Sequence, residues 1–135
     1  MSATTKTRVS PKRAIQVSGR SGRTLIGRIW RGRTEAERAD EYQAYLYPEG
    51  VLTIEAKPGC VGVQMFRRVK GGIAEFTVIS YWESMDAMQA MHSDGGNVLR
   101  VAHLKRDWEF LLELPELVEL TELHVNDWNI RSLAD

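Results

Sequence analysis

The chain has 135 residues, of which 43% are hydrophobic and 27% charged, a composition typical of one globular domain with its own core. No apolar run approaches the roughly 18 residues of a membrane span, and the first residues lack the apolar stretch of a secretory signal. We therefore expect a cytoplasmic protein with no membrane partner. The single cysteine, Cys60, excludes an intramolecular disulfide and offers no cluster of metal ligands, so no metal is expected.

The net charge of zero conceals an uneven distribution. Residues 1–23 carry six of the 18 basic residues and no acidic one, which leaves a net charge of −6 on the rest of the chain. This Ser-, Thr- and Gly-rich segment lacks hydrophobic periodicity, so the sequence predicts a disordered basic arm over 1–23, one domain over 24–126 and a tail over 127–135. A nucleic-acid arm and a transit peptide are the functional alternatives. The arm has no aromatic residue to stack on a base, and we expect no nucleic-acid partner.

The first elements of the domain are an expected strand and an expected helix. Alternating apolar residues predict a strand over 24–32. Thr34 is expected to cap the following helix, because Glu37 stands at the third helical position of a capping box. Pro48 and Gly50 are expected to interrupt that helix, since proline removes a backbone donor and glycine favours turns.

Two strands joined by a glycine turn are predicted next, over 61–69 and 73–81. The second is almost unbroken apolar and β-favouring, which indicates cover on both faces. Ser84 is expected to cap a second helix. A helical piece over 107–114 and a last strand over 117–125 complete the chain.

This order of strand, helix, strand, strand, helix and strand predicts an α+β ferredoxin-like fold, with an antiparallel sheet and its helices on one face. Two amphipathic helices cover only one face of such a sheet. The other face is expected to meet a second copy of the chain, so a homodimer through the open sheet face is predicted.

The chain resembles the antibiotic biosynthesis monooxygenase family over about 25–125, in segments that read IGRIWRGRT, PGCVGVQMFRR, AEFTVISYWESMDAM and LLELPELVELTEL. The resemblance implies a dimeric α+β barrel, with a ligand cavity in each subunit between sheet and helices. It implies oxidation of an aromatic or polyketide-like phenol or quinol with O₂, without metal, flavin or other cofactor. The alternatives are a non-catalytic or stress-related dimer that binds a small aromatic ligand and, as a minor one, a heme-binding protein.

Arg28 is the most unusual candidate for the site. It alternates in phase with Ile26 and Trp30 on a strand that looks central, where an unpaired charge is costly to bury. An ion pair with Glu75 or Glu122 would be its structural explanation. Stabilising the anion of a bound phenol is the functional one.

Trp82 and His103 join Arg28 as candidate catalytic residues. Trp82 ends a strand, where its ring lines the cavity or packs in the core. The resemblance places His103 near the iron-binding histidine of heme-degrading relatives, but the positions matching their asparagine and tryptophan hold Gly27 or Arg28 and Met91. Methionines at helical spacing are usually core, and histidines are usually packed or solvated. With those structural alternatives open, the candidate substrate-binding residues are Trp30, Met65, Met88, Met91 and His92.

Overall fold

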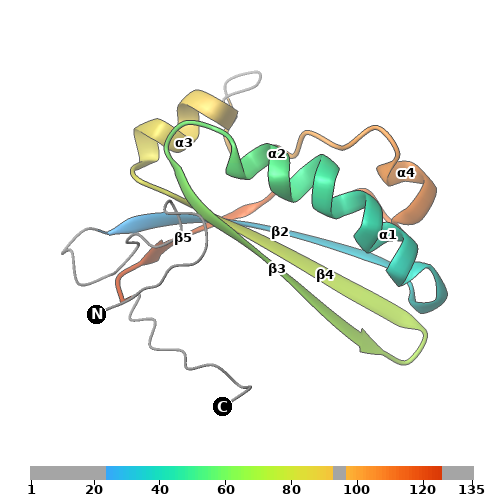
Figure 1. The fold of residues 1–135 in the computed structure, drawn as a ribbon. Coiled ribbons are helices and arrows are strands. Elements are labelled where there is room, and N and C mark those ends of the chain that lie inside the picture. The colour runs from blue at the N-terminus through green and yellow to red at the C-terminus, as the bar shows by residue number, and fades with distance from the viewer. Residues whose placement is uncertain (1–23, 93–96, 126–135) are drawn as a thin grey trace, which may run out of the picture. The chain divides into compact units, whose positions relative to one another are not determined.

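The computed structural model describes residues 24–92 and 97–125, which form a four-stranded sheet with helices on one face (Figure 1). The strands are β2 (Leu25–Glu35), β3 (Cys60–Lys70), β4 (Ile73–Trp82) and β5 (Glu119–Leu123), in the spatial order β3-β4-β2-β5. β4 is antiparallel to both β2 and β3. This arrangement confirms the predicted ferredoxin-like fold. The predicted arm over 1–23 and tail over 127–135 lie outside the described residues.

The helices are α1 (Ala39–Leu46), α2 (Leu52–Glu55), α3 (Met85–His92) and α4 (Asp107–Phe110). A compact unit spans Leu25–Glu122. Among the described residues, no helix combines the length and the apolar composition that crossing a membrane requires.

Burial along β4 alternates without exception, as expected for a strand with a period of two. One set of side chains is buried under the helices, and the other set is half-exposed on the opposite face. The register places Ile26 opposite Trp82 and Ile29 opposite Ile79, so β2 continues the same two faces. The buried residues of β4 are Ala74, Phe76, Val78, Ser80 and Trp82.

The core consists of two clusters on the helix side of the sheet. In the larger one, the ring of Tyr42 on α1 lies 5.2 Å from the rings of Phe76 and Phe110. The smaller one joins Cys60, Trp82 and Met88 at the other end of the sheet. The space between the α1–α2 run and α3 is therefore flanked by the larger cluster on one side and the smaller cluster on the other.

The first helix begins later than the capping box predicts. β2 continues to Glu35, a 3₁₀ turn follows at Ala36–Arg38, and α1 starts at Ala39. Thr34 is fully buried inside the strand, and its hydroxyl donates to the Glu35 carbonyl. The predicted cap is wrong, because the pairing of Thr34 with Ala74 extends the β-ladder over the segment.

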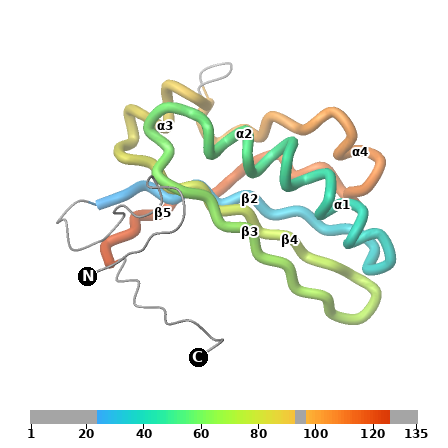
Figure 2. The backbone as a smooth tube through the Cα atoms, viewed as in Figure 1, coloured from blue at the N-terminus to red at the C-terminus, as the bar shows by residue number. Residues whose placement is uncertain are grey.

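Pro48 and Gly50 do not end the helical path, contrary to the prediction. A π-helical turn at Tyr47–Val51 carries the chain from α1 directly into α2, and the backbone N–H of Leu52 donates to the Tyr47 carbonyl five residues earlier. Proline lacks a backbone N–H and disturbs the regular α-helical hydrogen bonds, and the widened π-helical turn falls at this position. Figure 2 shows this continuous run from α1 through α2 before the chain enters β3.

The later elements follow the predicted order with different bounds. Ser84 caps α3 as expected, because its hydroxyl accepts the backbone N–H of Ala87 at 3.1 Å. The helix predicted over 107–114 is limited to α4, since Leu111 leaves the helix in an extended conformation and bridges to Thr34 of β2. The last strand is β5, shorter than the predicted 117–125.

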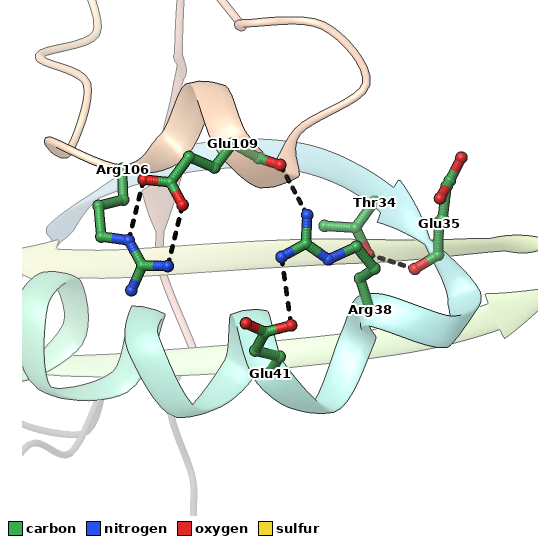
Figure 3. A network of polar contacts seen from close by, with 6 residues as sticks. All are labelled: Thr34, Glu35, Arg38, Glu41, Arg106 and Glu109. Atoms are coloured by element: carbon green, nitrogen blue, oxygen red, sulfur yellow. Dashed lines mark hydrogen bonds and ion pairs between the residues drawn. The ribbon is translucent and has the colours of Figure 1, made fainter.

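Polar contacts connect α4 to the start of α1, through Arg38 at the end of the preceding 3₁₀ turn (Figure 3). The Arg38 guanidinium donates to the Glu109 carbonyl at 2.8 Å and to the Glu41 carboxylate at 3.2 Å. Arg106 donates twice to the Glu109 carboxylate, at 3.0 and 2.9 Å. Both guanidinium groups also lie over the Phe110 ring. These contacts close the larger core cluster at the end away from α3.

Candidate functional site

A cavity of about 310 Å³ lies between the sheet and the helical run from α1 to α2. β2 and β4 form its floor, the end of α3 contributes one wall, and the segment 100–104 contributes another. Its lining residues are Arg28, Trp30, Leu46, Glu49, Gly50, Thr53, Ile54, Lys57, Val78, Met91, His92, Arg100, Val101, Ala102, His103 and Leu104.

Arg28 rises from the floor of the cavity and is only 8% exposed. Its Nη2 donates to the backbone carbonyls of Val98 at 3.2 Å and Arg100 at 3.1 Å. Its Nε is buried and has no hydrogen-bond partner. Burial lowers the pKa of Arg28 to about 10, so the guanidinium stays charged at neutral pH.

No described carboxylate forms an ion pair with Arg28, and the expected pairing with Glu75 is wrong. Glu75 lies on the opposite face of β4, where Arg68 donates to it at 2.7 and 3.1 Å. Backbone carbonyls therefore satisfy only part of the Arg28 guanidinium. The N–H of Nε is fully buried without a partner, and an unmade hydrogen bond in such a place is costly.

Lys57 and His92 bring two further basic groups to the cavity. Lys57 follows α2, and burial, with a smaller effect from the Arg28 charge, lowers its pKa. His92 ends α3, and its Nε2 is buried without a hydrogen-bond partner. Burial, followed by the charges of Arg28 and Lys57, lowers the pKa of His92 to about 4. The imidazole is therefore neutral at pH 7 and is packed edge-on against Trp82.

His103 stands at an exposed part of the wall. Its Nε2 lies 2.7 Å from the Pro115 carbonyl, which can only accept a hydrogen bond. The Nε2 atom must therefore carry the proton, and in the neutral ring Nδ1 is the nitrogen that can accept one. That is the protonation state that a general base requires.

The structure brings five of the eight sequence-predicted site residues to the cavity: Arg28, Trp30, Met91, His92 and His103. The other three are not among its lining residues. Trp82 is fully buried and donates from its indole nitrogen to the Ser80 hydroxyl at 2.9 Å. Met88 is fully buried beside it, and Met65 packs against the larger core cluster. These three have the structural role that the sequence left open.

Sequence reasoning missed Lys57, Glu49 and Arg100 as lining residues. Lys57 stands immediately before the Pro58-Gly59 turn, which marks a chain reversal but says nothing of where the preceding side chain points. In the described part of the chain, no group of three or more His, Cys, Asp or Glu residues could hold a metal ion.

A ferredoxin-like sheet with a partly apolar, basic cavity beneath its helices defines a small α+β protein with a site suited to an organic ligand. The chain belongs to the antibiotic biosynthesis monooxygenase family, whose model matches residues 26–95. This match confirms the resemblance seen in the sequence. A comparison with curated proteins gives no significant match.

Several solved structures are similar to the chain over most of its length. A Bacillus cereus protein named after the family is 15% identical, with a TM-score of 0.48, over 81% of this chain and 97% of that one. A Nitrosomonas europaea protein of unknown function is 18% identical, with a TM-score of 0.46, over 80% and 96%. The heme degrader MhuD from Mycobacterium tuberculosis, solved with two hemes in its active site, is 21% identical, with a TM-score of 0.43, over 78% and 99%.

Proposed function

We propose that the protein is a cofactor-independent monooxygenase that oxidises an aromatic or polyketide-like phenol or quinol with O₂ in this cavity. The observation that carries the proposal is the buried Arg28, a charged residue that lines a cavity on the helix-covered side of the sheet and has no carboxylate partner among the described residues. Membership of the antibiotic biosynthesis monooxygenase family supports this reaction class.

Two residues have separate roles in the proposed reaction: His103 is the base, and Arg28 stabilises the anion. His103 Nδ1 accepts the proton of the bound phenol or enol, since Nε2 is held as a donor by the Pro115 carbonyl. Arg28 lies in contact with the resulting anion and stabilises it electrostatically, an interaction that is strong because little water reaches the group. Trp30, Ile54 and Val78 supply apolar wall around the ring.

The electron-rich anion reduces O₂ directly, so the reaction balances without a further reductant. For a substrate that bears a CH₂ group activated by the aromatic system, as in an anthrone, one oxygen atom of O₂ becomes the new carbonyl oxygen. The other leaves as water with the two hydrogens of the CH₂ group. The substrate loses four electrons and O₂ gains four.

The test is O₂ uptake by the purified full-length protein with anthrone, after subtraction of the uncatalysed rate. Arg28→Met keeps much of the side-chain length without the charge, and His103→Gln removes the base. We expect each variant to lower kcat by about 10²-fold or more, as loss of a positioned base or of a charged stabilising group does.

Lys70→Met is the matched control, because Lys70 is an exposed cation at the end of β3 and does not line the cavity. Circular dichroism and thermal melting establish that each variant is folded. Unchanged rates in both site variants would remove Arg28 and His103 from the mechanism. Binding of anthrone without O₂ uptake by the wild-type protein would overturn the oxygenase proposal in favour of the non-catalytic ligand-binding alternative.

We further propose that the protein is a homodimer through the face of the sheet opposite the helices. No helix of residues 24–92 and 97–125 lies on that face (Figure 1). The register of β2 and β4 places the apolar side chains of Ile29, Ile79 and Tyr81 there. Phe66 on β3, 49% exposed, extends the same surface. A strand as apolar as β4 gains stability when its second face is also covered.

A further inference from the structure

Within the proposed function, the basic groups of the cavity specify the substrate further: we propose that it carries a carboxylate, bound by Lys57 and His92 beside Arg28. The three groups come from three different elements, since Arg28 lies on β2, Lys57 follows α2 and His92 ends α3. All three line the same cavity.

The lining residues of the cavity carry more positive than negative charges. Arg28 and Lys57 are two cations, and the charge of Arg28 contributes to the lowered pKa of Lys57. No described residue forms an ion pair with either of them. The reactive anion of a phenol provides one negative charge. A second anionic group on the same ligand would balance the second cation, and partly buried charges require such pairing.

Two buried nitrogen atoms of cavity-lining residues, Arg28 Nε and His92 Nε2, have no hydrogen-bond partner. Arg28 Nε is a buried N–H without a partner, on a residue that is 92% buried. His92 Nε2 is likewise buried without a partner, and it becomes a donor in one neutral tautomer or on protonation. A carboxylate has two oxygens that only accept hydrogen bonds, which matches this small number of donors. A phosphate carries a charge of about −2, so together with the phenolate it would exceed the two positive charges of Arg28 and Lys57.

Glu49 is the one carboxylate among the lining residues of the cavity. Glu49 lies in the π-helical turn, whereas Lys57 follows the end of α2, so the two side chains reach the cavity from different turns of the chain. Glu49 is exposed and, among the described residues, forms no ion pair with Arg28 or Lys57. An acid group of a ligand beside these two cations is therefore attracted rather than repelled.

The experiment uses three probes that share an aromatic ring system: 2-naphthoate, the neutral 2-naphthamide and 2-naphthyl phosphate. Calorimetric titration of the full-length protein at pH 7 should give about tenfold or tighter binding of naphthoate than of naphthamide, as a charge-assisted hydrogen bond predicts. Lys57→Met should abolish most of that preference and leave the affinity for naphthamide unchanged. Lys70→Met, which removes an exposed cation elsewhere, should preserve the preference.

Equal affinities for naphthoate and naphthamide would overturn the inference, as would a preference that survives in Lys57→Met. Tighter binding of the naphthyl phosphate than of naphthoate would overturn the choice of carboxylate. Resonances of the His92 ring in NMR spectra should shift on addition of naphthoate, which locates the probe at this end of the cavity. The result is separable from the oxygenase test, because naphthoate binding without anthrone oxidation would support this inference and contradict the proposed reaction.

Discussion

At the scale of single residues, Arg28 has the environment that most needs a functional explanation. A guanidinium that is almost fully buried normally meets a carboxylate, but this one meets two backbone carbonyls and leaves its buried Nε without a partner. Lost hydration is only partly replaced by such contacts, as the lowered pKa of Arg28 reflects. An anionic ligand would complete the set of contacts, and both proposals rest on that deficit.

His92 gives a prediction at the same scale, because its pKa of about 4 in the folded protein lies below the ordinary value of 6.5. The unfolded chain takes up a proton at His92 as the pH falls through 6.5, and the folded protein does so only near pH 4. The contribution of His92 to the free energy of unfolding should therefore fall progressively between pH 6.5 and about 4 and then level off. Urea unfolding at a series of pH values measures this decline.

His92→Gln is the control for that measurement, since it removes the titrating ring and leaves the neighbouring charges of Arg28 and Lys57 in place. The difference in unfolding free energy between wild type and variant should change with pH inside this window and be constant above it. A difference that does not change between pH 7 and pH 4 would contradict the lowered pKa. Naphthoate should be absent, because an anion beside the ring would raise that pKa.

At the scale of elements, the continuous run from α1 through the π-helical turn to α2 places the cavity wall. It brings Leu46, Thr53 and Lys57 to one space, although Pro48 and Gly50 predict an interruption. The run is held against α4 by Tyr42, whose hydroxyl donates to the buried Asp107 carboxylate at 2.8 Å. Asp107 also accepts the backbone N–H of Leu104, which lines the cavity.

Tyr42→Phe should lower the free energy of unfolding by about 1–3 kcal/mol, because it leaves a buried carboxylate with one hydrogen bond fewer. Tyr47→Phe is the matched control: Tyr47 is 50% exposed, and its change should stay within about 0.5 kcal/mol. Equilibrium unfolding in urea measures both. Equal midpoints and slopes for the two variants would show that the Tyr42 hydroxyl contributes no net stability.

At the scale of the whole molecule, the proposed dimer predicts that Ile79→Lys produces a monomer. Ile79 pairs with Ile29 on the face opposite the helices, and a charge placed there would have to be desolvated on association. Sedimentation should give about twice the 15.3 kDa of one chain for the wild type and 15.3 kDa for the variant. Leu52→Lys, an exposed position on α2, should remain dimeric. A wild-type monomer at micromolar concentration would contradict the dimer.

The sequence by itself determined the order of the elements, the ferredoxin-like fold and the burial of Arg28. Alternation of apolar residues is a local signal, and strands such as β4 show it directly. The Ser84 cap is equally local, because the bond it makes spans three residues. The Thr34 cap failed because a strand pairing with a distant partner, Ala74, outweighed the local preference.

Only the tertiary structure decided what surrounds Arg28. Its partners are backbone carbonyls 70 and 72 residues away. Every residue has a backbone carbonyl, so no pattern of side chains predicts which ones Arg28 contacts. Lys57 and His92 reach the same cavity from the ends of two helices, whose lengths depend on the π-helical turn and on packing against Trp82. The chemistry of the site depends on charges that folding brings together. Because these residues are far apart along the chain, the sequence alone does not predict that they meet.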